Sequence, residues 1–259
     1  MGVTASIVKK EIKSYFTSPI AYVVIAVFSV MNGFVFFNYL SEFNMKVIQF
    51  LQIKIKYPEL SAELSINDWV LTPLFSNLSM LLLLLMPTVS MRLFAEEKRS
   101  GTFELLMTSP VTTLQIMLGK FFSCLFFYAV MLLTTIQYPL ILFSFGNPDI
   151  KPVLISYLML FLLGAAFIAV GMVASSLTEN QIIAAITSFG VLLIFWLVGW
   201  LGENIGGKAG EVISFFSLFI HLGDSLQGVL DTRDVVFYLS FIFFGLYVTY
   251  EALDSERWR

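Results

Sequence analysis

Charged residues are scarce in this chain of 259 residues. Asp, Glu, Lys and Arg together make up 13% of it, about half of the share found in ordinary soluble domains. Apolar residues make up 58%, and the mean hydropathy is +0.86. A soluble domain of this size cannot bury so many apolar side chains. The composition therefore excludes a soluble enzyme and indicates an integral membrane protein.

The chain also lacks an excess of basic residues, a set of metal ligands and a nucleotide-binding loop. Fifteen Lys and Arg against eighteen Asp and Glu give a net charge of -3, so we expect no binding of nucleic acid. One cysteine, Cys124, and one histidine, His221, exclude a disulfide, a cysteine-based zinc site and a histidine cluster within one chain. We predict no metal site, no catalytic residue and no bound cofactor. Because the sequence has no Gly-x-x-x-x-Gly-Lys-[Ser/Thr] loop, the chain does not hydrolyse ATP itself.

The intervals between charged residues predict the membrane spans. Five intervals hold 23 to 28 uncharged residues, and a sixth, from Asp234 to Glu251, holds 16. A helix needs about 20 apolar residues to cross the bilayer core. We therefore predict an all-α membrane protein with a single domain over residues 1–259 and six spans, at residues 20–40, 70–91, 121–145, 153–177, 182–202 and 234–253. The sixth crosses only if Asp234 and Glu251 lie at the two membrane surfaces, because 16 helical residues extend about 24 Å.

Six spans place both termini on one side of the membrane. With the N-terminus inside, the inner segments carry nine Lys and Arg and the outer segments carry six. This modest bias favours cytoplasmic termini.

Residues 1–19 are expected to form an amphipathic helix that lies on the cytoplasmic membrane surface and contacts lipid. Ala5, Val8, Ile12 and Phe16 form one apolar stripe along this helix. Lys9, Lys10 and Lys13 lie outside the stripe. Pro19 ends this helix before the first span. The alternative is a solvated leader.

Two segments are expected on the outer side. Residues 41–68 form a loop whose length suits a small helical cap or a partner contact. Residues 211–227 form an interfacial or re-entrant helix with one polar face, made of Ser214, Ser217, His221 and Asp224 or Ser225. His221 is either an ordinary interfacial polar residue or a proton- or metal-binding group. Pairs of small residues four positions apart predict close helix packing. They are Ala165/Ala169, Gly171/Ser175 and Ala184/Ser188.

Seven charged residues crowd the segment between the second and third spans, namely Arg92, Glu96, Glu97, Lys98, Arg99, Glu104 and Lys120. Gly101 permits a sharp turn there, and Thr102 is suited to cap a short helix over residues 103–107. Thr112 and Gln115 form a capping-box pattern at the start of the helix that enters the third span. Two short helices joined rigidly to two spans would transmit force from a soluble partner. The alternative is a plain charged loop.

Three sequence segments resemble ABC-2 type transporter permeases, most closely the permeases associated with gliding motility. They are residues 96–110 (EEKRSGTFELLMTSP), residues 9–22 (KKEIKSYFTSPIAY) and residues 221–236 (HLGDSLQGVLDTRDVV). The resemblance implies a six-span fold like that of type V exporters, in the bacterial inner membrane. It implies a dimer with a second copy or paralogue on two cytoplasmic ATPase subunits, which bind ATP and Mg²⁺, and a further subunit with a large periplasmic domain.

The resemblance also implies which residues couple the chain to the ATPase. They lie in the segment after the second span and are Glu96, Glu97, Lys98, Gly101, Thr102, Phe103, Glu104, Leu105 and Leu106. By the same resemblance, short outer helices precede the sixth span.

The sequence also bears on three functions other than that of a permease driven by a partner. An ion-coupled transporter is disfavoured because the first five intervals contain no ionisable residue. An intramembrane protease is disfavoured because Glu96 and Glu97 are followed by Gly101 where that pattern needs Arg. A permease-like subunit that transmits motion or aids assembly but moves no solute fits the uncharged spans equally well.

Overall fold

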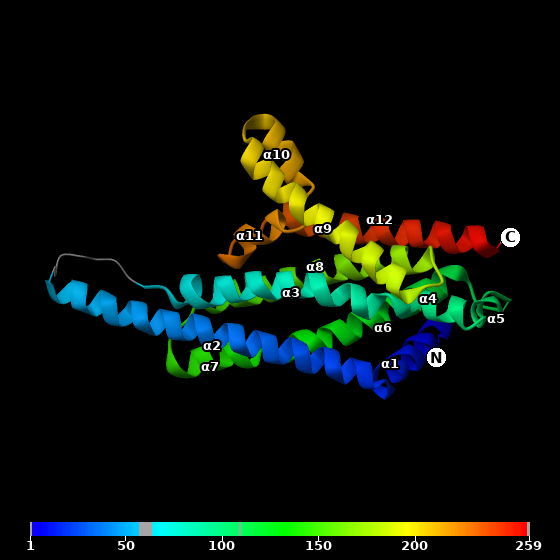
Figure 1. Cartoon of the computed structure of the whole chain (residues 1–259), viewed down its shortest axis with the longest axis horizontal. Coiled ribbons are helices and arrows are strands. Elements are labelled where there is room, and N and C mark those ends of the chain that lie inside the picture. The colour runs from blue at the N-terminus through cyan, green and yellow to red at the C-terminus, as the bar shows by residue number, and fades with distance from the viewer. Residues whose placement is uncertain (1, 57–63, 109, 258–259) are drawn as a thin grey trace.

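The computed structural model describes residues 2–56, 64–108 and 110–257 (Figure 1). Within these ranges the chain is helical and has no β-strand. Six stretches are long and apolar enough to cross a membrane, at Pro19–Lys56, Asn67–Arg99, Thr113–Phe145, Ile150–Ser176, Gln181–Ile205 and Thr232–Glu256. Each coincides with one predicted span, so the all-α membrane protein with six spans is confirmed.

The first span is much longer than the sequence intervals indicated. Helix α2 (Pro19–Lys56) has 38 residues and is therefore about 57 Å long. The prediction of an outer loop from residue 41 is wrong for residues 41–56, which continue the helix. No Gly or Pro interrupts them, and Glu42 and Lys46 form an ion pair one turn apart, with 2.6 Å between Oε1 and Nζ. Residues 57–63 of the predicted loop lie outside the described residues.

The second and third spans are each built from several helices. The second comprises the π-helix η1 (Asn67–Leu71), α3 (Thr72–Ser90) and α4 (Arg92–Arg99), and the third comprises α6 (Thr113–Leu133) and α7 (Gln137–Phe145), with α5 (Phe103–Thr108) between the two spans. The third span bends at Thr134 and Thr135. Their hydroxyls donate to the backbone carbonyls of Met131 and Leu132, at 2.7 Å in both cases, and such back-bonding commonly bends helices.

Helix α8 (Ile150–Ser176) lies at the centre of the bundle. It contacts α3, α6, α9 (Gln181–Ile205), α11 (Ile220–Leu226) and α12 (Thr232–Arg257). Its small residues are buried, as predicted. A Cβ on Gly171 would overlap the Ser90 hydroxyl of α3, so α3 and α8 approach closely only because this position has no side chain.

The chain before the last span folds differently from the prediction. The prediction of a single helix over residues 211–227 is wrong. The chain turns at residues 216–219, between α10 (Gly207–Phe215) and α11. Helix α10 folds back along the end of α9, and the two project together from the bundle (Figure 1). A Cβ on Gly210 would lie 2.5 Å from the carbonyl oxygen of Gly202, so the two backbones touch.

Both termini lie at the same end of the bundle, together with α4 and α5 (Figure 1). Helix α1 (Val3–Thr17) packs against α6 there, and Ser18 separates it from α2. Lys9, Lys10 and Lys13 are exposed, whereas Phe16 is half-buried against the ring of Phe127. The amphipathic N-terminal helix is thus present, and its contact with the membrane surface stays a prediction.

Candidate functional site: the elbow between the second and third spans

The charged segment at the end of the second span forms two short helices, α4 and α5, joined by a turn, and we call residues 91–108 the elbow. Helix α4 ends at Arg99, and the chain turns at Gly101, whose φ of +70° is open to glycine and strained for other residues. The amide of Gly101 donates to the Lys98 carbonyl at 3.2 Å, and the amide of Thr102 donates to the Glu97 carbonyl at 3.0 Å. These bonds close the end of α4. The predicted turn at Gly101 is confirmed.

Thr102 joins the two helices of the elbow. Its carbonyl accepts from the Leu106 amide at 3.1 Å, which opens α5. Its hydroxyl lies 2.9 Å from the Ser100 hydroxyl and 3.4 Å from the Glu97 carbonyl oxygen, to which it donates. Thr102 therefore directly precedes α5, at the predicted cap position, but its hydroxyl bonds to the end of α4.

The predicted capping box at the start of α6 is confirmed. The Gln115 amide donates to the Thr112 hydroxyl at 3.3 Å, and the Thr112 amide donates to the side-chain oxygen of Gln115 at 3.2 Å. Two amides that have no partner within the helix are thereby satisfied. The chain thus leaves the elbow in a fixed direction.

Ser175 of α8 holds the bend between α3 and α4. Its Oγ accepts from the amides of Phe94 and Ala95, both at 3.0 Å, and donates to the Met91 carbonyl at 2.8 Å. The side chain is fully buried. Helix α4 is therefore capped by a residue of another span. The sequence predicted only close packing for Ser175.

Lys120 connects the elbow to two further helices. Its Nζ lies 2.9 Å from Oε1 of Glu97 in α4 and 3.3 Å from Oε1 of Glu11 in α1. The Lys120 side chain is 3% exposed, and the glutamates are 17% and 15% exposed. Such a buried cation is stable only with charged partners. The sequence placed Lys120 in the charge cluster but gave no sign of Glu11.

Lys98 connects the other face of α4 to α8 and α12. Its Nζ donates to the carbonyl of Ser176 at the end of α8 and to Oε1 of Glu256 in α12, at 2.5 Å in both cases. The same Nζ lies 5.1 Å from the ring centroid of Phe103. Helix α4 is therefore bound through side chains to α1, α6, α8 and α12.

The nine predicted coupling residues divide between two faces of the elbow. Five are exposed, namely Glu96, Gly101, Thr102, Glu104 and Leu105, and four are half-buried, namely Glu97, Lys98, Phe103 and Leu106. Leu105 is 72% exposed although it is apolar. The exposed face is therefore open to a partner, and the half-buried face carries the contacts with the spans.

A second polar cluster surrounds His221 on α11. Its Nδ1 lies 2.6 Å from Oδ1 of Asp234 and its Nε2 lies 2.9 Å from the carbonyl oxygen of Phe215. The ring stacks on Phe237 with 3.9 Å between centroids and is 5% exposed. His221 is therefore a buried residue that joins α10, α11 and α12. The two side chains bury each other, and the expectation that His221 and Asp234 lie at the level of the membrane surface stays a prediction.

Among the described residues, no group of three or more His, Cys, Asp or Glu is arranged to hold a metal ion. A family model described as ABC-2 family transporter protein matches residues 5–248. No curated protein matches the sequence.

Proposed function

We propose that this chain, which belongs to the ABC-2 transporter family, is a permease subunit whose elbow receives the movement of a separate cytoplasmic ATPase. The family match covers nearly the whole chain, and the six apolar helices make it a multi-pass membrane protein. The sequence has no phosphate-binding loop of its own. ATP and Mg²⁺ therefore belong to the partner subunit.

The observation that carries this proposal is the attachment of α4 to four other helices. Lys120 joins it to α1 and α6, Lys98 joins it to α8 and α12, and Ser175 caps it from α8. A force on the exposed face of the elbow would therefore move the ends of several spans together. A loop without such contacts would absorb the force locally.

The position of the elbow supports a cytoplasmic docking face. It lies at the end of the bundle that carries both termini (Figure 1), where Lys9, Lys10 and Lys13 are exposed. Lysines next to a membrane favour the cytoplasmic side. We propose that this end faces the cytoplasm of a bacterial cell and that two copies, or this chain and a paralogue, sit on two ATPase subunits.

Co-purification with an ATP-binding cassette ATPase from the cells that make this chain tests the proposal. Replacing Leu105 by Ser removes an apolar contact from the exposed face of α5, and we expect the amount of co-purified ATPase to fall about tenfold. The matched control is Val212→Ser, because Val212 is also an exposed apolar residue, at 64% against 72%, but lies on α10. Equal recovery with both variants and with the unaltered chain would contradict the proposed docking face.

A second function, in which the subunit transmits motion and moves no solute, is favoured by the length of α2. Residues 41–56 extend this helix well beyond the roughly 30 Å of a bilayer core. Apolar side chains stay exposed there, including Met45, Ile48 and Leu51, which suits a partner with a large domain outside the membrane, as in gliding-type systems. Deletion of residues 43–56 separates the two functions, since it would release such a partner while leaving the ATPase bound.

A further inference from the structure

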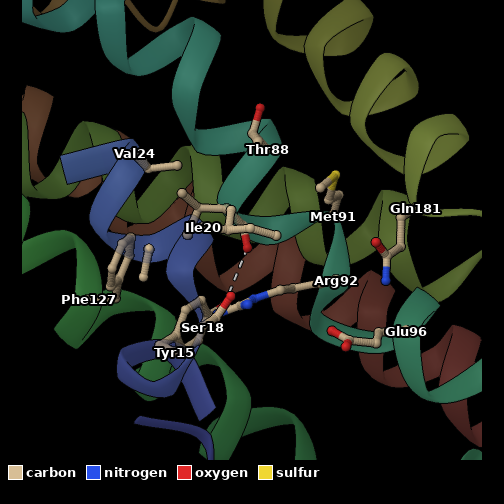
Figure 2. A pocket seen from close by; sticks show the side chains of 12 residues that line it. Tyr15, Ser18, Ile20, Val24, Thr88, Met91, Arg92, Glu96, Phe127 and Gln181 are labelled. Carbon is tan, nitrogen blue, oxygen red and sulfur yellow. Dashed lines mark hydrogen bonds between the residues drawn. The ribbon is translucent and has the colours of Figure 1, made fainter. Parts of the chain in front are cut away.

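A cavity of about 120 Å³ opens beside the elbow, between the start of α2 and the bend from α3 to α4 (Figure 2). A single water needs only about 10–15 Å³ of such volume. One wall is apolar and includes Ile20, Val24 and Phe127. The polar lining residues are Ser18, Thr88, Arg92, Glu96 and Gln181. The cavity is therefore shaped for a ligand with a polar head and an apolar body.

The cavity lies where membrane-crossing helices begin, and we infer that this is the level of the lipid headgroups. Two membrane-crossing helices begin beside it, α2 at Pro19 and α9 at Gln181. Ile20, on the apolar side of the cavity, is 58% exposed and is therefore open to an acyl chain. This placement holds whichever side of the membrane the elbow occupies.

Arg92 is fixed in this cavity by an aromatic stack. Its guanidinium carbon lies 3.9 Å from the ring centroid of Tyr15, and Tyr15 in turn stacks on Phe127 with 5.1 Å between centroids. Burial raises the pKa of Tyr15 well above its usual value, so the phenol stays neutral and its ring face attracts the cation. A stacked guanidinium still presents its N–H groups at its edge, where they suit a phosphate.

Glu96 supplies a charge of opposite sign one helical turn away. Figure 2 shows Glu96 and Gln181 on one side of Arg92, whose guanidinium extends away from them over the Tyr15 ring. None of the ion pairs among the described residues includes Arg92 or Glu96. Both side chains line the same cavity, so a ligand bound there can reach a cation and an anion.

We propose that this cavity binds the headgroup of a phospholipid that carries both a phosphate and a primary ammonium. The phosphate accepts from the edge of Arg92, the ammonium donates to Glu96, and the acyl chains lie along the wall formed by Ile20 and Val24. Phosphatidylethanolamine has this pattern of charge. Phosphatidylglycerol lacks the ammonium, and the quaternary ammonium of phosphatidylcholine has no N–H to donate.

Native mass spectrometry of the full-length protein tests the proposal by titration with dioleoyl phosphatidylethanolamine and dioleoyl phosphatidylglycerol. We expect the unaltered protein to bind the ethanolamine lipid at least tenfold more tightly. Glu96→Gln abolishes this preference, and Arg92→Gln weakens the binding of both lipids about tenfold, with Arg92→Lys partly restoring it. The matched controls Arg99→Gln and Glu104→Gln remove the same charges from exposed positions outside the cavity and leave both affinities unchanged.

Three results would overturn the proposal. They are equal affinity of the unaltered protein for the two lipids, an undiminished preference in Glu96→Gln, and an equal loss in the two controls. Phosphoethanolamine without acyl chains and inorganic phosphate are used as competitors to identify the source of the phosphate. We expect neither to displace the lipid at millimolar concentration, and displacement by either would assign the cavity to a soluble phosphate compound.

Discussion

The ammonium of Lys120 in α6 lies 2.9 Å from a carboxylate oxygen of Glu97 in α4, in a position where the lysine side chain is 3% exposed. The second carboxylate oxygen of Glu97 is buried and has no hydrogen-bond partner among the described residues. Glu97 thus faces the bundle, while its neighbour Glu96 faces outward. Through this pair the elbow becomes a part of the helix bundle and not an independent loop.

Removing the lysine of this pair should be strongly destabilising. In Lys120→Met the carboxylates of Glu97 and Glu11 lose their shared cation, and we expect the free energy of unfolding in mixed micelles to fall by about 3–5 kcal/mol. The double variant Lys120→Met with Glu97→Gln should lose less than the sum of the single changes. Strict additivity would show that the two side chains do not interact. The control is Lys151→Met, because Lys151 is exposed at the start of α8.

The cap that α8 supplies to α4 should be measurable by itself. Ser175→Ala leaves the amides of Phe94 and Ala95 without their acceptor, and we expect a loss of about 1–2 kcal/mol in the same unfolding assay. Ser176→Ala is the matched control, because that hydroxyl donates to the Val173 carbonyl within its own helix. The cap would be unimportant if both variants unfolded alike.

The buried pair of His221 and Asp234 should stabilise the helices before the last span. The two ring nitrogens lie against Oδ1 of Asp234 and the carbonyl oxygen of Phe215. Asp234→Asn keeps the shape of the side chain but removes its charge, so we expect a loss of about 1.5–3 kcal/mol. The exposed residue Glu203 gives the control Glu203→Gln. Because we assign the pair a structural role, we also expect that adding zinc or a chelator leaves the unfolding temperature of the protein unchanged.

The orientation of the chain can be tested by labelling introduced cysteines in spheroplasts with a membrane-impermeant maleimide. The native thiol, Cys124, is fully buried and should stay unlabelled. We expect Val212→Cys on α10 to react from outside and Leu105→Cys on α5 to react only after permeabilisation. The reverse pattern would invert the proposed topology.

Local signals in the sequence predicted the fold well. The charge-free intervals located all six spans, and the Gly101 turn and the Thr112–Gln115 capping box were recognised because each depends on residues a few positions apart. The extension of α2 was missed because charged residues at 42 and 46 end an apolar interval without ending a helix. Charge marks the limit of a span, whereas only Gly, Pro or a cap marks the limit of a helix.

The site was predicted less completely because its contacts are long-range. Ser175 lies 80 residues beyond the amide of Ala95 that it caps, and Glu11 lies 109 residues before Lys120. No spacing rule connects such positions. The orientation of Glu97 toward the bundle and of Glu96 toward the cavity likewise depends on how α4 packs, since the two residues are neighbours in the chain.

Site-specific photocrosslinking from position 105 tests the proposed role of the elbow most directly. A photoreactive phenylalanine analogue replaces the exposed Leu105 in living cells, and position 212 on α10 carries the same analogue as the control. We predict that position 105 crosslinks to a cytoplasmic protein with an ATP-binding cassette and that position 212 does not. Crosslinks from position 105 to lipid alone, or to a protein outside the cytoplasm, would contradict the proposed coupling.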